Sequence, residues 1–392
     1  MSSDDEIPQS VHFQFTLLTN RLVDSGTDVH ERRKVPLTLL TGYLGAGKST
    51  LLEEPWLPHC CVHECTDIES KSLQMSNPND PSATTSSMLS LPNGCLCCSF
   101  KDMGIAAIEE MVAAQKEKID WVIVELTGLA DPAPIAKDFW TNEEMGDLIL
   151  DSVVCVVDCR NVLRQLDEPT PDDGKTANST DASGKKDPIS AAQKQIACSD
   201  VILLNKTDLV TPEQLDEIEK RVRSINPTLR VYKTEHSKVP LPKLYNLKAF
   251  SESTLLGGKQ EDDSTSCAGC SDGSHDHSHH TDGISTVTLP LPRQITFDQF
   301  QNLEKFLQDI LWKSPTKESK YDILRTKGYM RVDVEGKIQE KVVQGVADLF
   351  DIKDAHATPG EVKPKIVLIG RDLDGPKKES LFREFGLHLM AS

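Results

Sequence analysis

The sequence predicts an α/β fold: a doubly wound, mostly parallel sheet followed by a second, smaller α+β unit. Short apolar runs typical of buried strands recur at residues 35–40, 121–124, 153–157 and 201–204. Helical spacing separates some of these runs, as at residues 103–118. Strands that alternate with helices over about 200 residues favour a parallel sheet covered by helices on both faces.

Polar segments divide the chain. Residues 1–33 have no sustained hydrophobic period and are expected to form a flexible arm, so the first domain is placed at 34–250. Residues 167–188 are expected to be a surface insertion in that domain. Residues 251–283 are rich in Ser, Gly, Asp and His, and we expect a disordered linker because they bury too little apolar surface to offset the entropy of ordering. The second domain then covers 284–392.

The second domain shows both the alternation typical of strands and the spacing typical of helices. Residues 284–291 alternate between apolar and polar side chains and end in prolines, which predicts a strand. Residues 297–312 carry aromatic and aliphatic side chains at helical spacing, and residues 329–334 and 365–370 have the composition of strands. An α+β unit of about 100 residues, a usual domain size, is therefore expected.

Composition excludes several classes of function. The 392 residues include 43 basic and 61 acidic side chains, a net charge of −18, which argues against general nucleic-acid binding and against adhesion to an anionic membrane. The acidic N-terminus lacks the basic region and apolar run of a secretory signal or mitochondrial presequence. We therefore expect a cytoplasmic protein, with the nucleus as the alternative, in which the 11 cysteines stay reduced.

A phosphate-binding loop follows the first predicted strand. Residues 42–49 match G-x-x-x-x-G-K-[ST], in which glycines let backbone N–H groups face phosphate oxygens and the lysine balances β/γ-phosphate charge. This motif predicts a P-loop NTPase, with Lys48 as a catalytic residue that stabilises developing phosphate charge. The residues expected to bind the phosphates are Gly42, Gly45, Ala46, Gly47, Lys48, Ser49 and Thr50.

A second motif predicts which base is bound. Asn205, Lys206, Thr207 and Asp208 form N-K-x-D directly after the predicted strand at 201–204. The Asp208 carboxylate can accept two hydrogen bonds from a guanine edge, whereas adenine offers the wrong donor pattern. Together with the phosphate loop, this predicts GTP.

An acidic residue ends the strand at 121–124. Glu125 lies where P-loop enzymes place the acid that holds Mg²⁺, and we expect it to bind magnesium together with Ser49 and to be a catalytic residue. Asp158, at the end of the next strand, is a lower-ranked candidate for a similar purpose.

Cysteine clusters predict a zinc site. Cys95, Cys97 and Cys98 place three thiols within four residues, a ligand set that suits Zn²⁺ or a related soft ion and leaves a fourth position open for transfer. A buried apolar turn or a redox pair is the alternative. A weaker accessory zinc site in the linker, or simply a solvated polar segment, is the interpretation of Cys267, Cys270, His275, His277, His279 and His280. Cys155, Cys159 and Cys198 fall on predicted core elements and are expected to be structural.

The ordered motifs resemble the CobW family of metallochaperone GTPases, in particular its eukaryotic zinc-regulated GTPase metalloprotein activators. The resemblance covers roughly residues 35–385 apart from the two polar segments, and the segments that carry it are 42–49, 93–99, 125–132, 205–209, 311–312, 323–328, 343–346 and 368–374. It implies a GTPase that binds zinc at the three closely spaced cysteines and passes it to a client apoprotein. In the eukaryotic relatives a type-one methionine aminopeptidase is the expected client, together with an N-terminal Cys-Pro-Glu-Leu-Val-Pro docking motif. The N-terminal arm of this chain, with Ile7-Pro8 in an acidic context, lacks that cysteine.

The chain departs from the family pattern after the phosphate loop. Pro55 and Pro58 would break the long helix expected there, and cysteines and histidines occupy 59–65 where a strand is expected. Either this member has rebuilt residues 53–66 as a metal loop, or the segment is an error in the gene model, which we prefer because a missing strand leaves a hole in the sheet. A non-hydrolysing zinc-buffering or adaptor protein that retains the GTPase fold is the alternative function.

Overall fold

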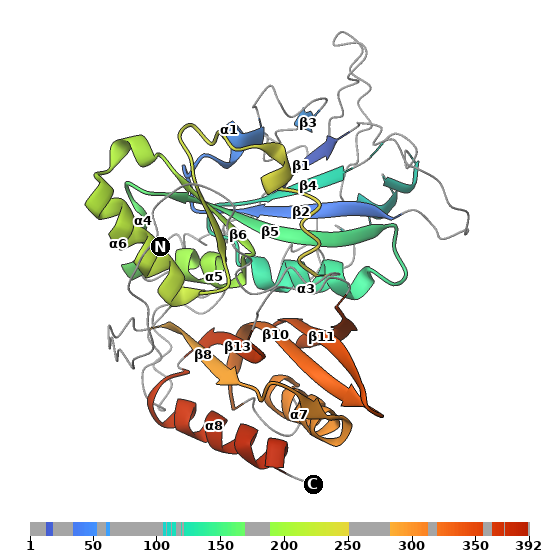
Figure 1. Cartoon of the computed structure of the whole chain (residues 1–392). Helices are drawn as coiled ribbons and strands as arrows, with labels where there is room; N and C mark the ends of the chain where they lie inside the picture. Colours follow the sequence, from blue (N-terminus) through green and yellow to red (C-terminus); the bar gives the residue numbers. More distant parts are fainter. Residues whose placement is uncertain are drawn as a thin grey trace, which may run out of the picture.

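Two β-sheets, each with its own helices, organise the chain (Figure 1). The computed structural model describes residues 13–18, 34–52, 60–62, 105–106, 108–110, 112–114, 119, 121–168, 189–250, 283–312, 320–355, 363–371 and 373–390. Within these residues the predicted α/β sheet and the smaller α+β unit are both present, so the predicted fold class is confirmed.

The first sheet has the strand order β3-β1-β4-β2-β5-β6-β7, and β4, β2, β5, β6 and β7 run parallel. The parallel strands are β2 (Val35–Thr41), β4 (Trp121–Leu126), β5 (Leu148–Asp158), β6 (Val201–Asn205) and β7 (Arg230–Lys233). Strand β5 begins five residues before the predicted run, because Leu148–Leu150 pair with Val35–Leu37 before a register shift. Almost every residue of β2, β5 and β6 is buried, as expected for strands covered on both faces.

The connections of this sheet are helical. They are α1 (Lys48–Leu52), α3 (Pro132–Asn142), α4 (Val162–Asp167), α5 (Ala191–Cys198) and α6 (Pro212–Ile225), with the described residues of 105–114 also helical and the 3₁₀ turns η1 (Thr207–Leu209) and η2 (Leu241–Lys243). Local chemistry sets several starts: Asp131 caps α3, Ser190 caps α5, and Thr211 with Gln214 forms a capping box on α6.

Two short strands extend the sheet beyond β4. β1 (Phe13–Leu18) pairs antiparallel with β4, and β3 (Cys60–Val62) pairs antiparallel with β1. β1 lies within the segment for which the sequence predicted a flexible arm, and that expectation was wrong for these residues. The physical reason is that the outer edge of β4 offers unpaired backbone groups, and a segment of high β-propensity satisfies them. The position next to β4 is thus occupied by β1.

The second unit is an antiparallel sheet with helices on one face. Its order is β12-β11-β10-β13-β8, with β9 paired to β10. The elements are β8 (Ile284–Pro290), β9 (Ile295–Thr296), α7 (Phe297–Leu311), β10 (Asp322–Val334), β11 (Lys337–Val346), β12 (Leu349–Asp354), β13 (Lys365–Arg371) and α8 (Gly375–Met390). The elements predicted at 284–291, 297–312, 329–334 and 365–370 are present, the third of them as the end of a longer β10.

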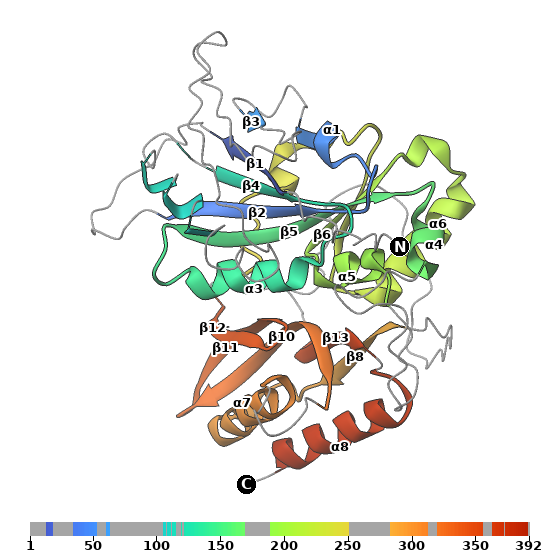
Figure 2. The ribbon, with the colours of Figure 1, turned by 180° about the vertical axis from the view of Figure 1, so that it is seen from behind.

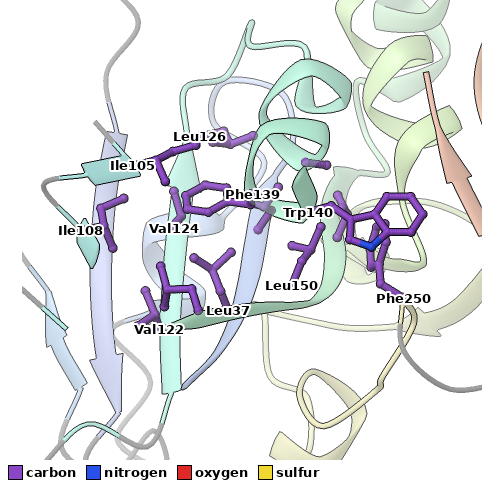
Figure 3. Packing of buried hydrophobic residues seen from close by; sticks show 14 of the residues in the cluster. Leu37, Ile105, Ile108, Val122, Val124, Leu126, Phe139, Trp140, Leu150 and Phe250 are labelled. Atoms are coloured by element: carbon purple, nitrogen blue, oxygen red, sulfur yellow. The ribbon is translucent and has the colours of Figure 1, made fainter. Parts of the chain in front are cut away.

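The two units pack through helices of the first. In Figures 1 and 2, which show opposite sides, α3 and α5 lie between the parallel sheet and the second sheet, and α7 and α8 cover the far face of the second sheet. Side chains of β2, β4, β5 and α3 form one core, in which Trp140 packs edge-on against Phe250 at 5.2 Å between ring centroids (Figure 3). In the part of the chain described, no helix has the length and apolar character needed to cross a bilayer.

Candidate functional site

The predicted phosphate loop lies between β2 and α1, at the carboxyl edge of the parallel strands. Its glycines at 42, 45 and 47 have φ values of 140°, 75° and 109°, in the region that favours glycine. Close contacts add a second constraint, because a Cβ on Gly42 would lie 2.3 Å from the carbonyl oxygen of Val156 and one on Gly47 would lie 2.5 Å from Asn205 Nδ2. The loop therefore requires glycine both for its dihedral angles and for its contacts with β5 and β6.

Lys48 begins α1 and is buried against the loop. Its Nζ donates to the carbonyl oxygen of Gly42 at 2.8 Å and to that of Tyr43 at 3.4 Å. Burial lowers the pKa of Lys48, and the nearby carboxylate of Glu125 offsets this only in part. The ammonium group is thus held within the concave side of the loop, where phosphate oxygens would contact it.

Glu125 lies on β4 opposite the loop. It pairs in register with Leu40 of β2, is 7% exposed, and accepts a hydrogen bond from the Ser49 hydroxyl at 3.4 Å. The structure therefore brings together the two residues expected to bind magnesium. A hydroxyl beside a carboxylate is a hard oxygen donor set of the kind Mg²⁺ prefers, so these residues fit that ion.

The N-K-x-D segment is tied directly to the phosphate loop. Asn205 is 2% exposed, and its Nδ2 donates to the carbonyl oxygen of Ala46 at 2.9 Å. Lys206 has a left-handed backbone (φ 61°), and its Nζ donates to the carbonyl oxygen of Gly45 at 2.8 Å. Thr207 and Asp208 form η1, with Asp208 exposed. One buried amide and one lysine thus hold the segment on the loop, and the Asp208 carboxylate remains accessible to a base.

Sequence reasoning missed the loop that follows β7. Ser237 donates through its N–H to Asn205 Oδ1 at 2.8 Å and through its Oγ to the carbonyl oxygen of Gly47 at 2.9 Å, while Thr234 Oγ1 donates to Asn205 Oδ1 at 3.2 Å. His236 and Ser237 have positive φ values of 51° and 60°. The signal that could have found them is position: they follow the next parallel strand, whose carboxyl end lies at the same edge.

Gln195, which sequence reasoning also missed, supports the loop after β4. Gly128 lies so close to the phosphate loop that an added Cβ would be 2.4 Å from Leu44 N. The buried side chain of Gln195, on α5, donates to the carbonyl oxygens of Gly128 at 3.0 Å and Ala130 at 3.2 Å. Position 128 therefore requires glycine for space, since its backbone is not in the left-handed region, and α5 fixes its distance from the phosphate loop.

The predicted zinc ligands lie outside the described residues. This applies to Cys95, Cys97 and Cys98 and to the accessory set Cys267, Cys270, His275, His277, His279 and His280. Among the residues that the structure does describe, no group of three or more His, Cys, Asp or Glu could hold a metal ion. Cys155, Cys159 and Cys198 are buried free thiols, and burial raises the pKa of each to about 12, which agrees with a structural role.

Parallel strands whose carboxyl ends carry a glycine-rich loop, a lysine and an opposed hydroxyl–carboxylate pair define a P-loop nucleotide-binding domain. The chain belongs to the CobW family. Residues 36–233 match the model of the CobW/HypB/UreG nucleotide-binding domain, and residues 284–386 match that of the cobalamin synthesis protein CobW C-terminal domain.

Named relatives cover most of the chain. Zinc-regulated GTPase metalloprotein activator 1 of Saccharomyces cerevisiae is 32% identical over 383 residues, which is 91% of this chain and 85% of that protein. The zinc chaperone CobW of Pseudomonas aeruginosa is 27% identical and covers 90% of this chain and 92% of its own length. Among solved structures, Zn(II)-bound YjiA GTPase from Escherichia coli superposes with a TM-score of 0.57 at 24% identity, covering 90% of this chain and 98% of that one, which supports the fold.

Proposed function

We propose that this protein is a GTP-hydrolysing zinc metallochaperone, which binds zinc at Cys95, Cys97 and Cys98 and transfers it to a client apo-metalloprotein. The observation that carries the GTP part is the N-K-x-D segment, because Asn205 and Lys206 are bonded to the phosphate loop while Asp208 is exposed beside them. The zinc part is supported by the family and by relatives named as zinc-regulated GTPase activators and zinc chaperones.

Each residue of the site has a role in phosphoryl transfer from GTP to water. Backbone N–H groups of the phosphate loop bind phosphate oxygens, and Lys48 supplies positive charge where charge develops on the β/γ-phosphates. The Ser49 hydroxyl and the Glu125 carboxylate would hold Mg²⁺, which neutralises phosphate charge when bound. Lys48 is already desolvated and bonded to the carbonyl oxygen of Gly42, so little reorganisation is needed to present it to a phosphate.

Zinc is the cargo in this proposal. Three thiolates leave one coordination position for a ligand of the client, which permits exchange rather than permanent retention. The Cys motif lies between Lys48 and Glu125 in the sequence, and loops at the carboxyl ends of neighbouring strands converge in a doubly wound sheet, so nucleotide and zinc binding are proposed to be coupled. Linkage then requires that each tighten the other by the same factor. A methionine aminopeptidase is the client proposed from the family resemblance, and localisation in the cytoplasm is proposed with it.

The experiment that tests base selection is competition binding with GTP, ATP and XTP. Asp208→Asn exchanges a carboxylate acceptor for an amide donor and should move preference from GTP to XTP. Asp216→Asn makes the same change at an exposed position on α6 and should leave the preference for GTP intact. Equal displacement of labelled GTP by ATP and GTP in the parent protein would refute guanine selection.

Turnover and cargo are tested separately. Phosphate release from GTP with and without Zn²⁺ distinguishes a GTPase from a non-hydrolysing zinc-buffering protein. Zinc affinity is then measured by chelator competition in a non-hydrolysable GTP analogue and in GDP, in the parent and with serine at Cys95, Cys97 and Cys98. We expect tighter zinc binding in the GTP-like state and loss of the tight site in the triple variant; tight zinc retained after the triple change would refute the site.

A further inference from the structure

Asp158 is a buried acid at the carboxyl end of β5. It is 2% exposed and lies in register with Asn205 across the β5–β6 ladder, where the N–H of Cys159 donates to the carbonyl oxygen of Asn205 at 3.0 Å. Its Oδ1 accepts from the backbone N–H of Arg160 and its Oδ2 from Asn161 Nδ2, both at 2.9 Å. These bonds hold the carboxylate rigidly at the end of the strand.

The remaining partner of this carboxylate is Lys206. Its Nζ lies 2.8 Å from Asp158 Oδ2 and 2.8 Å from the carbonyl oxygen of Gly45, so one ammonium group joins β5 to the phosphate loop. The lysine side chain is 31% exposed, whereas the aspartate side chain is 3% exposed. The ion pair therefore joins a buried carboxylate to a partly exposed lysine, and the exposed Asp208 follows that lysine two residues later.

Building on the proposed function, we propose that Asp158 is a positioning residue for guanine-nucleotide binding. It holds the aliphatic stem of Lys206 in place as the surface on which the guanine base packs. An unanchored lysine stem has many rotamers, and ordering it on binding costs free energy that a preformed ion pair avoids. The left-handed backbone of Lys206 gives the side chain the direction that reaches both acceptors. Asp158 thus acts on the nucleotide through Lys206.

The same geometry removes Asp158 as a candidate magnesium ligand. Both of its oxygens already accept hydrogen bonds, and a lysine ammonium, which repels a divalent cation, lies against one of them. Burial opposes ionisation of Asp158, but the hydrogen bonds from Lys206 and Asn161 outweigh it, so the pKa of Asp158 lies below its usual value. Glu125, bonded to Ser49, is the acid at the phosphate side of the site.

A double-mutant cycle tests this proposal on the full-length protein. Asp158→Asn and Lys206→Met are made singly and together, and Kd is measured for fluorescent N-methylanthraniloyl derivatives of GDP and GTP. Loss of the charge-assisted bond between Asp158 and Lys206 predicts Kd about 10-fold weaker for both nucleotides in Asp158→Asn. Lys206→Met should lose at least as much, because it also gives up the bond to the carbonyl oxygen of Gly45. Because both changes release the same anchor, the double variant should bind no worse than the weaker single variant. Asp167→Asn, which removes a carboxylate from the exposed pair with Arg221, is the matched control and should not change Kd.

The kinetic readout separates positioning from general damage. With GTP saturating, kcat and the Mg²⁺ concentration for half-maximal hydrolysis should stay unchanged in Asp158→Asn, while KM rises with Kd. Lys206→Met keeps an apolar stem and removes only the anchored ammonium, so it tests the anchor even where Asp158→Asn fails to fold. Parent-like Kd in Lys206→Met, additive losses in the double variant, or a raised Mg²⁺ requirement would overturn the proposal. If the parent does not prefer GTP, the proposed function fails by itself, and the cycle measured with the nucleotide that does bind still decides whether Asp158 acts through Lys206.

Discussion

Asp200→Asn should strongly destabilise the packing of the two units. Asp200 lies between α5 and β6, and its Oδ1 is 2.6 Å from Arg325 Nη2 and 2.8 Å from Lys327 Nζ, both on β10 of the second unit. Its Oδ2 accepts from the N–H of Val153 at 3.0 Å. Asp200 and Lys327 are almost wholly buried and Arg325 has no exposed surface, so this ion cluster is removed from water.

The expected magnitude follows from these contacts. Arg325 and Lys327 outweigh the effect of burial and hold the pKa of Asp200 below its usual value, so the carboxylate is ionised. Asparagine has one acceptor oxygen; if that oxygen keeps the bond from Val153, its amide group faces two cations. Removing one partner of a buried ion pair costs about 3–5 kcal/mol because the other charge stays buried and uncompensated. That is a large part of a typical total stability of about 5–15 kcal/mol.

Urea unfolding followed by tryptophan fluorescence measures the effect. Trp140 reports on the cluster because it packs on Phe250, whose ring lies 4.3 Å from Arg325 Cζ. With an m value of about 3 kcal/mol per M, the midpoint should fall by about 1–2 M. Asp167→Asn, in an exposed pair, should cost at most about 1 kcal/mol.

A pH series adds an independent check. Burial lowers the pKa of Lys327, and Asp200 opposes that shift. Without Asp200, Lys327 releases its proton more readily in the folded state, so the unfolded state binds more protons and the stability of the variant rises with pH. The deficit relative to the parent should therefore be smaller at alkaline pH. A midpoint indistinguishable from that of Asp167→Asn would refute the reasoning.

Three further predictions concern other sites. Gly128→Ala should lower kcat/KM for GTP by about 10-fold or more, because its Cβ would lie 2.4 Å from Leu44 N, whereas Gly386→Ala has open space and should be neutral; equal activities would contradict this. Burial raises the pKa of Asp151 to about 6, so the folded state binds its proton more tightly and up to about 3 kcal/mol of stability is lost as pH rises from about 4 to about 6. Urea midpoints against pH should show this loss in the parent and not in Asp151→Asn, and parallel profiles would exclude it. Phe306→Ala leaves a cavity at a fully buried position in the core between the sheet and helices of the second unit and should cost about 3–5 kcal/mol in urea unfolding, where a loss below about 1 kcal/mol would argue against tight packing.

Elements with a strong local pattern could be predicted from the sequence. The parallel strands β2, β4 and β6 are apolar runs, and α7 has clear helical spacing. Each of them can therefore be recognised from its own residues, without knowledge of the elements that it packs against. β11 was not predicted, because its first half is exposed and carries polar residues, and its pairing with β10 decides that it is a strand. β1 was placed in a flexible arm for a similar reason, since its partner β4 lies more than 100 residues away.

The candidate site, too, has a part that could be predicted from the sequence and a part that could not. The phosphate loop and the N-K-x-D segment are runs of consecutive residues, so their chemistry can be inferred directly from the sequence. Ser237 and Asp158 hold these runs in place and Gln195 holds the loop after β4, and each reaches its partner across a separation of tens of residues or more. No local pattern shows which partner each of these residues reaches, because a single serine, glutamine or aspartate is compatible with many roles.

The sequence by itself therefore determined the fold class, the positions along the chain of the strands with strong apolar runs, and the residues of the phosphate loop and the N-K-x-D segment. Local propensity and contiguous motifs encode all of these. Only the tertiary structure decided that Asn205 and Lys206 are bonded to the phosphate loop, that Asp158 anchors Lys206 instead of standing beside Ser49, and that Asp200 joins the two units. The physical reason is that hydrogen bonds and buried ion pairs depend on distances of about 3 Å. Such distances are set when strands from remote parts of the chain align at one edge of a sheet.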